Sequence, residues 1–192
     1  MNKNYEVESG DCIVFEALEK AFPGKFKRDF DFGATTYVAG AEGSFAFDYL
    51  VYVQYCDAFM DVSVVAPVRF SKESVGCEAF ERANAYVNEA NRTGVCAMRL
   101  DHSGRLCVQL AIFEDKSAIR ESVRKVIDCL DCNFLPLAQV VYDANADPGK
   151  CAFDASRKLV AKYGVGVKGA CLGASLQAQA SSVHQWKGRR KC

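Results

Sequence analysis

The sequence predicts an α+β fold in which helices pack on one antiparallel sheet, in the order α-β-β-β-α-β-β-α. Three observations predict it. Apolar and polar residues alternate over 44–55 and 58–66, as in strands with one wet face. A helical period fills 77–91. Two further alternating runs, 95–101 and 105–113, flank a short turn and are typical of a hairpin.

The first part of the chain is expected to supply one helix and the early strands. A helix over 12–22 is ended by Pro23 and Gly24. Strand signals follow at 26–30 and 34–39, which count as one split strand in the order above. The long strand 44–55 then places alternate residues on opposite faces of the sheet. We expect one face to pack on helices and the other to face solvent.

The middle of the chain reads as a helix followed by a tight hairpin. Gly94 ends the helix, and the turn Asp101-His102-Ser103-Gly104 joins the hairpin strands, with Gly104 free to take a positive φ. One apolar face of the helix is formed by Phe80, Ala83, Val87 and Ala90.

A third helix is expected from about residue 117 to Asp143, with Asp115 or Ser117 as its N-cap. Pro136 lies inside it and is expected to kink or loosen it rather than end the pattern. The composition changes after Ala144. We therefore predict a body, 1–145, and a basic extension rich in Gly and Ala, 146–192, in which 151–163 could form a short helix.

Charge is distributed unevenly between these two parts. Residues 1–143 carry 15 Lys and Arg against 22 Asp and Glu, whereas 144–192 carry 9 against 2. The basic tail could lie across the acidic body and neutralise it. Alternatively, it could contact a nucleic-acid backbone or an anionic lipid surface. Charge asymmetry alone does not decide between these two interpretations.

Composition also bounds where the protein works. Residues 1–8 contain no apolar region of the kind found in signal peptides, and no run approaches the ~18 apolar residues of a membrane span. We therefore expect a cytoplasmic protein whose ten cysteines are mostly reduced. Most of these cysteines stand among apolar residues, where a free thiol behaves as a small hydrophobic group.

The element order and two segments resemble the bacterial YbjN family. The segments are 83–92, Ala-Asn-Ala-Tyr-Val-Asn-Glu-Ala-Asn-Arg, and 99–109, Arg-Leu-Asp-His-Ser-Gly-Arg-Leu-Cys-Val-Gln. Members of that family tend to have an Asn-rich second helix followed by a hairpin of this pattern, and they resemble the class I chaperones of type III secretion in fold. The resemblance implies an antiparallel sheet backed by helices, dimerisation, and binding of another protein rather than catalysis. Family members have been described as regulators.

Two groups of residues are candidate contacts for a partner. On the strand 44–55, the face that carries Leu50 and Tyr52 among polar residues is the better candidate for a binding surface, because the aromatic face is expected to be core. Asn84, Asn88 and Asn91 form a polar stripe on the second helix. They could pair across a dimer interface, or they could hydrogen-bond the hairpin backbone or face water.

Motifs for catalysis, metal binding or cofactor binding are weak in this sequence. Cys129 and Cys132 form a CxxC inside a helical run, with no second CxxC to complete a zinc site. The run 164–169 satisfies GxGxxG but follows a helix instead of a strand and has no acidic residue after it. The two histidines, His102 and His184, stand in segments expected to be exposed. We therefore predict no cofactor, no metal and no catalytic residue.

Three functions follow as hypotheses. The first is a non-catalytic, chaperone-like or regulatory module that forms a homodimer and binds a partner polypeptide on its sheet. The second is an adaptor for nucleic acid or an anionic surface. The third is an uncharacterised enzyme, since catalytic groups assemble in space rather than in sequence. The adaptor would act through tail residues, namely Trp186, Lys187, Arg189, Arg190 and Lys191.

Overall fold

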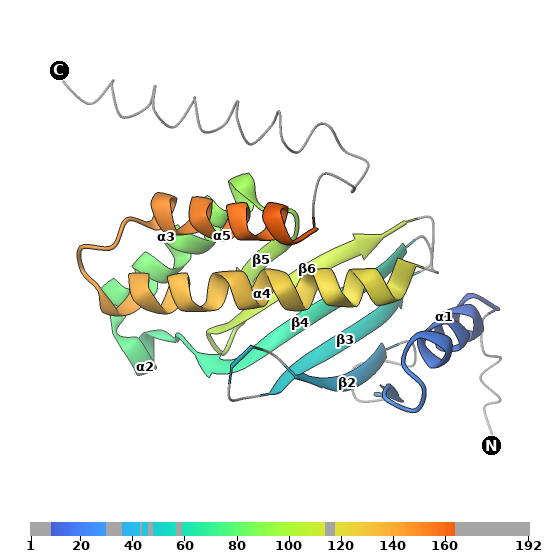
Figure 1. Cartoon of the computed structure of the whole chain (residues 1–192). Coiled ribbons are helices and arrows are strands. Elements are labelled where there is room, and N and C mark those ends of the chain that lie inside the picture. Colours follow the sequence, from blue (N-terminus) through green and yellow to red (C-terminus); the bar gives the residue numbers. More distant parts are fainter. Residues whose placement is uncertain are drawn as a thin grey trace.

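The computed structural model describes residues 9–29, 36–42, 44–45, 48–56, 59–113 and 118–163. Over these residues the chain is an α+β fold with one six-stranded antiparallel sheet and helices packed on it (Figure 1). The helices are α1 (Ser9–Ala21), α2 (Lys72–Val75), α3 (Cys77–Thr93), α4 (Ile119–Tyr142) and α5 (Pro148–Tyr163). The strands are β1 (Lys27–Arg28), β2 (Thr36–Glu42), β3 (Asp48–Cys56), β4 (Phe59–Arg69), β5 (Ala97–Leu100) and β6 (Arg105–Ile112).

The sheet follows the chain closely in its order, β1-β2-β3-β4-β6-β5. Neighbouring strands pair in register, with Val53 opposite Val62 and Val64 opposite Val108. The register shifts between Val65 and Arg69, and β4 pairs again with β6 at Arg69, opposite Arg105. Local pairings of this kind explain why a sequence of alternating runs and short turns was enough to predict the meander.

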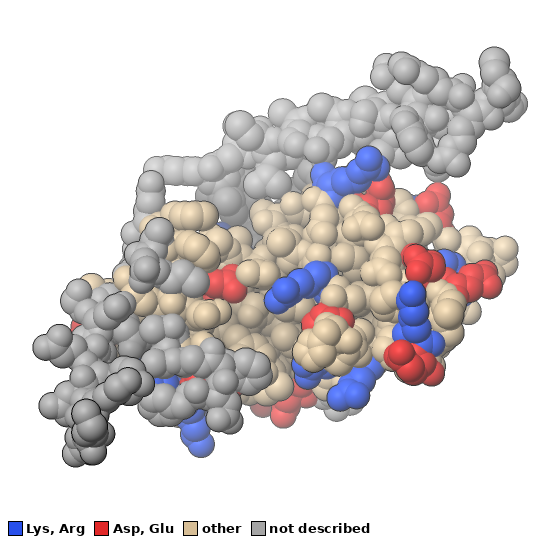
Figure 2. Space-filling model, turned by 180° about the vertical axis from the view of Figure 1, so that it is seen from behind, with Lys and Arg blue, Asp and Glu red and all other residues tan. Residues whose placement is uncertain are grey.

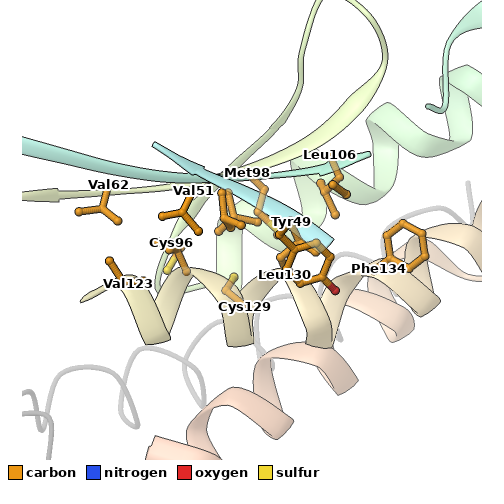
Figure 3. Packing of buried hydrophobic residues seen from close by; sticks show 14 of the residues in the cluster. Tyr49, Val51, Val62, Cys96, Met98, Leu106, Val123, Cys129, Leu130 and Phe134 are labelled. Carbon is orange, nitrogen blue, oxygen red and sulfur yellow. The ribbon is translucent and has the colours of Figure 1, made fainter. Parts of the chain in front are cut away.

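The core lies between the sheet and the helices. Figure 1 shows α4 running across the strands, with α3 and α5 beside it. Alternate strand residues point into this layer, and Figure 3 shows Tyr49, Val51 and Val62 meeting Val123 and Leu130 of α4. The apolar residues that repeat with a helical period in α4 are buried, except for the half-buried Ile127; they are Ile119, Val123, Val126, Leu130, Phe134, Leu137 and Val141.

Two short elements differ from the expected order, whereas α4 agrees with it. The split early strand forms two separate strands, of which β1 pairs only through Lys27 and Arg28. The polar segment before α3 forms the short helix α2, which Ser71 caps through its side chain. The helix α4 continues through Pro136 as far as Tyr142.

Helix α5 packs on the body although its sequence belongs to the predicted extension. Ala152 and Leu159 are buried in the same hydrophobic cluster as the sheet residues. The hydroxyl groups of Thr93 and Ser156 lie 3.0 Å apart, which ties α5 to the end of α3. The packed core therefore reaches at least to Leu159, beyond the expected boundary at 145. Among the described helices, none is long and apolar enough to cross a membrane.

Candidate binding surface

One face of the sheet is free of helices in the part of the chain that the structure describes. We call it the open face and define it by Leu50, Tyr52, Asp61, Ser63 and Gln109, which alternate with the core residues of β3, β4 and β6. Figure 2 looks from behind the view of Figure 1, onto the side opposite α4, and shows a largely uncharged surface with separate basic and acidic groups. The open face is therefore neither a second core nor a uniformly charged surface.

The register places the open-face residues in rows across the strands. Tyr52 lies opposite Ser63, and Ser63 lies opposite Gln109. Leu50 lies in the next row, opposite Val65. Its side chain is 42% exposed, which is unusual for a leucine in the middle of a strand. The two sheet residues predicted as partner contacts, Leu50 and Tyr52, thus both point away from the helices.

A polar pair occupies the centre of this face. The side-chain amide of Gln109 donates a hydrogen bond of 2.9 Å to Oδ2 of Asp61. The other oxygen, Oδ1, is buried and has no hydrogen-bond partner among the described residues. Burial raises the pKa of Asp61, although the hydrogen bond from Gln109 and the charge of Arg99 partly oppose it. The carboxyl group is thus held on the sheet with one acceptor unused.

Arg99 of β5 adds a cation to the polar side chains of this face, in the row next to that of Gln109. Its guanidinium group interacts with the thiol of Cys107, on the neighbouring strand β6. Burial raises the pKa of Cys107, whereas the hydrogen bond and charge of Arg99 lower it. The Arg99 residue itself is exposed. The open face therefore offers a cation, a carboxyl group and amide groups beside apolar side chains.

An aromatic pair lies at one end of the open face. Phe59 has the same strand parity as Asp61, and its ring lies 5.5 Å from that of Phe113. Phe113 follows the last residue of β6 and is 70% exposed. Aromatic groups exposed beside polar donors and acceptors are typical of protein-binding surfaces.

The hairpin at the other end of the sheet is held by a network around Asp101. Its Oδ1 accepts hydrogen bonds from the backbone N–H groups of Ser103, at 2.8 Å, and Arg105, at 2.9 Å. Its Oδ2 forms an ion pair with Arg105 at 2.8 Å. Burial raises the pKa of Asp101, but these hydrogen bonds, with one from the Ser103 hydroxyl, outweigh burial and lower it to about 2.

Gly104 is required in this turn for two reasons. Its φ of 77° lies in the left-handed region, as the turn predicted. A Cβ at this position would also lie 2.5 Å from the backbone nitrogen of Ser71. The turn therefore packs directly on the chain that enters α2, and the Phe70 N–H donates to the Gly104 carbonyl at 2.6 Å.

A second carboxylate, Asp131 of α4, anchors the segment between β2 and β3. It accepts hydrogen bonds from the backbone and hydroxyl groups of Ser44 and from the hydroxyl of Tyr49. Burial raises the pKa of Tyr49, and Asp131 raises it further. A neutral tyrosine bound to a carboxylate at the edge of the core is a structural brace for this segment.

The three asparagines of α3 have different surroundings. The side-chain amide of Asn91 pairs with both backbone groups of Met98, donating to its carbonyl at 2.8 Å and accepting from its N–H at 2.7 Å. It thereby closes the outer edge of β5 as a neighbouring strand would. Asn88 is exposed and Asn84 is half-buried. Neither side-chain amide makes a hydrogen bond within the described residues. The stripe therefore braces the hairpin at Asn91, while Asn84 and Asn88 are left for other contacts.

The CxxC of α4 is embedded in the helix. Cys129 is fully buried and Cys132 half-buried. Within the described residues, no group of three or more His, Cys, Asp or Glu side chains is placed to hold a metal ion. His102 is exposed in the hairpin turn. Several predicted sites lie outside the described residues, namely the GxGxxG run 164–169, His184 and the tail residues Trp186, Lys187, Arg189, Arg190 and Lys191.

Sequence reasoning missed the group of polar side chains on the open face, Asp61, Gln109 and Arg99. It also missed the role of Asn91 at the edge of β5. The signal for Asp61 was present, since it interrupts an apolar strand. Its partner could not be identified without the strand order, because β6 lies next to β4 while β5 lies beyond it.

Comparison with protein-family models, with curated proteins and with solved structures gave no match.

Proposed function

We propose that this chain is a cytoplasmic, non-catalytic module that binds an extended segment of another polypeptide on the open face. The observation that supports it is the exposed Leu50 and the half-buried Tyr52 beside the Asp61–Gln109 hydrogen bond. Apolar side chains supply buried area on binding, and the flanking polar groups fix the orientation of a backbone. The resemblance to the YbjN family and to secretion chaperones supports the same chemistry.

The arrangement of the face favours an extended segment over a small molecule. The residues lie in rows across neighbouring strands. Leu50 and Gln54 are exposed on β3, and Ala111 is exposed on β6. A long, shallow surface of this kind matches the side chains of a strand or loop. The chaperone-like role also accounts for an acceptor on Asp61 that no described residue uses.

A matched pair of leucine substitutions tests the proposal. Leu50 and Leu135 are both exposed, but Leu135 lies on α4, on the opposite side of the molecule. The full chain carrying Leu50→Lys is expected to lose a partner that both the wild type and Leu135→Lys capture from cell extract. Hydrogen exchange of the complex should then show protection on β3 and β4. Equal capture by all three proteins, or protection on the helices only, contradicts the proposal.

A further inference from the structure

One end of the open face carries two carboxylates of like charge side by side. Glu42 of β2 lies directly opposite Asp48 of β3, so both side chains point to the same face of the sheet. Asp48 precedes Leu50 by two residues on β3, which places the pair on the open face beside this leucine. We call Glu42 and Asp48 the acidic corner.

The acidic corner is an unfavourable arrangement that a cation would relieve. Both residues are exposed, and neither side chain makes an ion pair or a hydrogen bond within the described residues. Like charges directly opposite each other destabilise a pair of strands. The neighbouring Leu50 is 42% exposed, so the same place also offers apolar surface. A segment that fits here carries several cations and a large apolar side chain.

The last residues of this same chain have that composition. The segment 184–192 contains the only tryptophan of the protein and no acidic residue. Its four Lys and Arg residues all follow this tryptophan, Trp186; they are Lys187, Arg189, Arg190 and Lys191. The charge of the segment is therefore complementary to that of the acidic corner, and Trp186 supplies the apolar group.

The chain before this segment is long enough to bring it to the open face. Helix α5 ends at Tyr163, on the helix side of the sheet (Figure 1). The 23 residues from 164 to 186 span up to about 75 Å when fully extended. A body of this size has a radius of gyration of about 15 Å, so half its circumference is about 60 Å. The segment 184–192 can therefore reach the opposite face of its own sheet.

We propose that residues 184–192 dock on the acidic corner of the open face and compete there with the partner polypeptide. Trp186 covers Leu50, and the cations that follow it face Glu42 and Asp48. Because the segment is tethered, its effective concentration at the corner is high, and weak ion pairs are sufficient to hold it. The docking stands independently, whereas the competition rests on the proposed function. A partner must then bind more tightly than the tethered segment to displace it.

The fluorescence of Trp186 in the full chain tests the docking without any partner. At low salt we expect its emission at a shorter wavelength than in the urea-unfolded protein, because docking removes the indole from water. About 1 M salt should shift the emission to longer wavelength, since the Debye length falls to about 3 Å and exposed charges are screened. Emission at the wavelength of the unfolded protein already at low salt overturns the proposal.

Two charge reversals locate the contact. Asp48→Lys should shift the emission to longer wavelength at low salt. Asp154→Lys makes the same change of net charge at another exposed aspartate, on α5 and on the helix side, and should leave the emission unchanged. Equal shifts in the two variants mean that the tail follows the overall charge of the body, and they overturn the assignment to the acidic corner.

A change in the tail itself tests the competition. The full chain carrying both Arg189→Glu and Arg190→Glu should release Trp186 and capture more partner from cell extract than the wild type does. Release of Trp186 without a gain in capture overturns the competition. If no protein captures a partner, wild type included, the proposed function fails, and the fluorescence of Asp48→Lys and Asp154→Lys still decides the docking.

Discussion

The two faces of the sheet share the same strands but have opposite chemistry. Val51, Val53, Val62 and Val64 point to the helices and are buried, while their neighbours Leu50 and Asp61 point away from them. Polar groups on the helix side find complete partners, as in the Tyr86 hydroxyl, which donates to Asn133 at 2.6 Å. Asp61 on the open face leaves one oxygen without a described partner. The buried apolar contacts therefore lie on one face of the sheet, and the unused hydrogen-bond acceptor of Asp61 lies on the other.

The largest contrast is expected from placing the same charge on each face. Val64→Lys buries an ammonium group among β3, β6 and α4, and should lower the free energy of unfolding by more than about 4 kcal/mol. Leu50→Lys leaves the charge in water and should change it by less than about 1 kcal/mol. Urea denaturation followed by circular dichroism measures both. A loss at Leu50 as large as that at Val64 means that the open face is covered.

The alternation that creates this contrast could be predicted from the sequence. A period of two assigns residues to faces without knowledge of neighbouring strands, so the outward direction of Leu50 and Tyr52 followed from 44–55 alone. The apolar residues of 119–141 repeat with a helical period in the sequence, and most of them are buried in α4. Patterns of this type depend only on residues that are close in the sequence. They can therefore be identified without knowing the tertiary structure.

Contacts between distant residues could not be predicted in this way. The hydrogen bond between Tyr86 and Asn133 depends on how α3 packs beside α4, and the sequence instead drew attention to the neighbouring Cys132. The partner of Asp61 depends on β6 inserting between β4 and β5. Sheet order is decided by packing and loop geometry, which no single segment contains.

The asparagines of α3 separate an edge contact from an exposed position. Asn91→Ala removes both hydrogen bonds to Met98 and should lower the free energy of unfolding by about 1–2 kcal/mol. Asn88→Ala should change it by less than about 0.5 kcal/mol. Urea denaturation of the two variants measures the difference. Equal effects contradict the assignment of Asn91 as the residue that closes β5.

Association is a separate readout for the same helix. If Asn88 contacts a second copy, Asn88→Leu should change the sedimentation of the full chain while its unfolding stays close to that of wild type. If the sedimentation of Asn88→Leu and wild type coincides at every concentration, the predicted dimer contact at this position is wrong. Because Asn88 is exposed, the variant is expected to leave the core undisturbed.

A small effect of the opposite sign is expected at the centre of the open face, where a substitution of Asp61 should raise the free energy of unfolding. Burial raises the folded-state pKa of Asp61, so the folded chain binds this proton more tightly than the unfolded chain. The carboxyl group therefore costs stability above its folded pKa. That cost disappears as the pH falls to the unfolded pKa of about 4. Asp61→Asn removes the buried charge and should raise the free energy of unfolding at pH 7, by up to about 1 kcal/mol.

The pH dependence distinguishes this cause from a general effect of the substitution. The gain from Asp61→Asn should shrink between neutral pH and about pH 4, where the carboxyl group of the wild type becomes neutral. Asp101 contributes in the opposite direction, because its lowered pKa supplies stability that is lost only as the pH falls from about 4 towards about 2. Subtracting the wild-type curve removes that contribution, since Asp101 is present in both proteins. A gain that stays constant with pH would falsify the assignment of the cost to the Asp61 charge, and a loss at pH 7 would mean that its ionised form is stabilised in the folded chain.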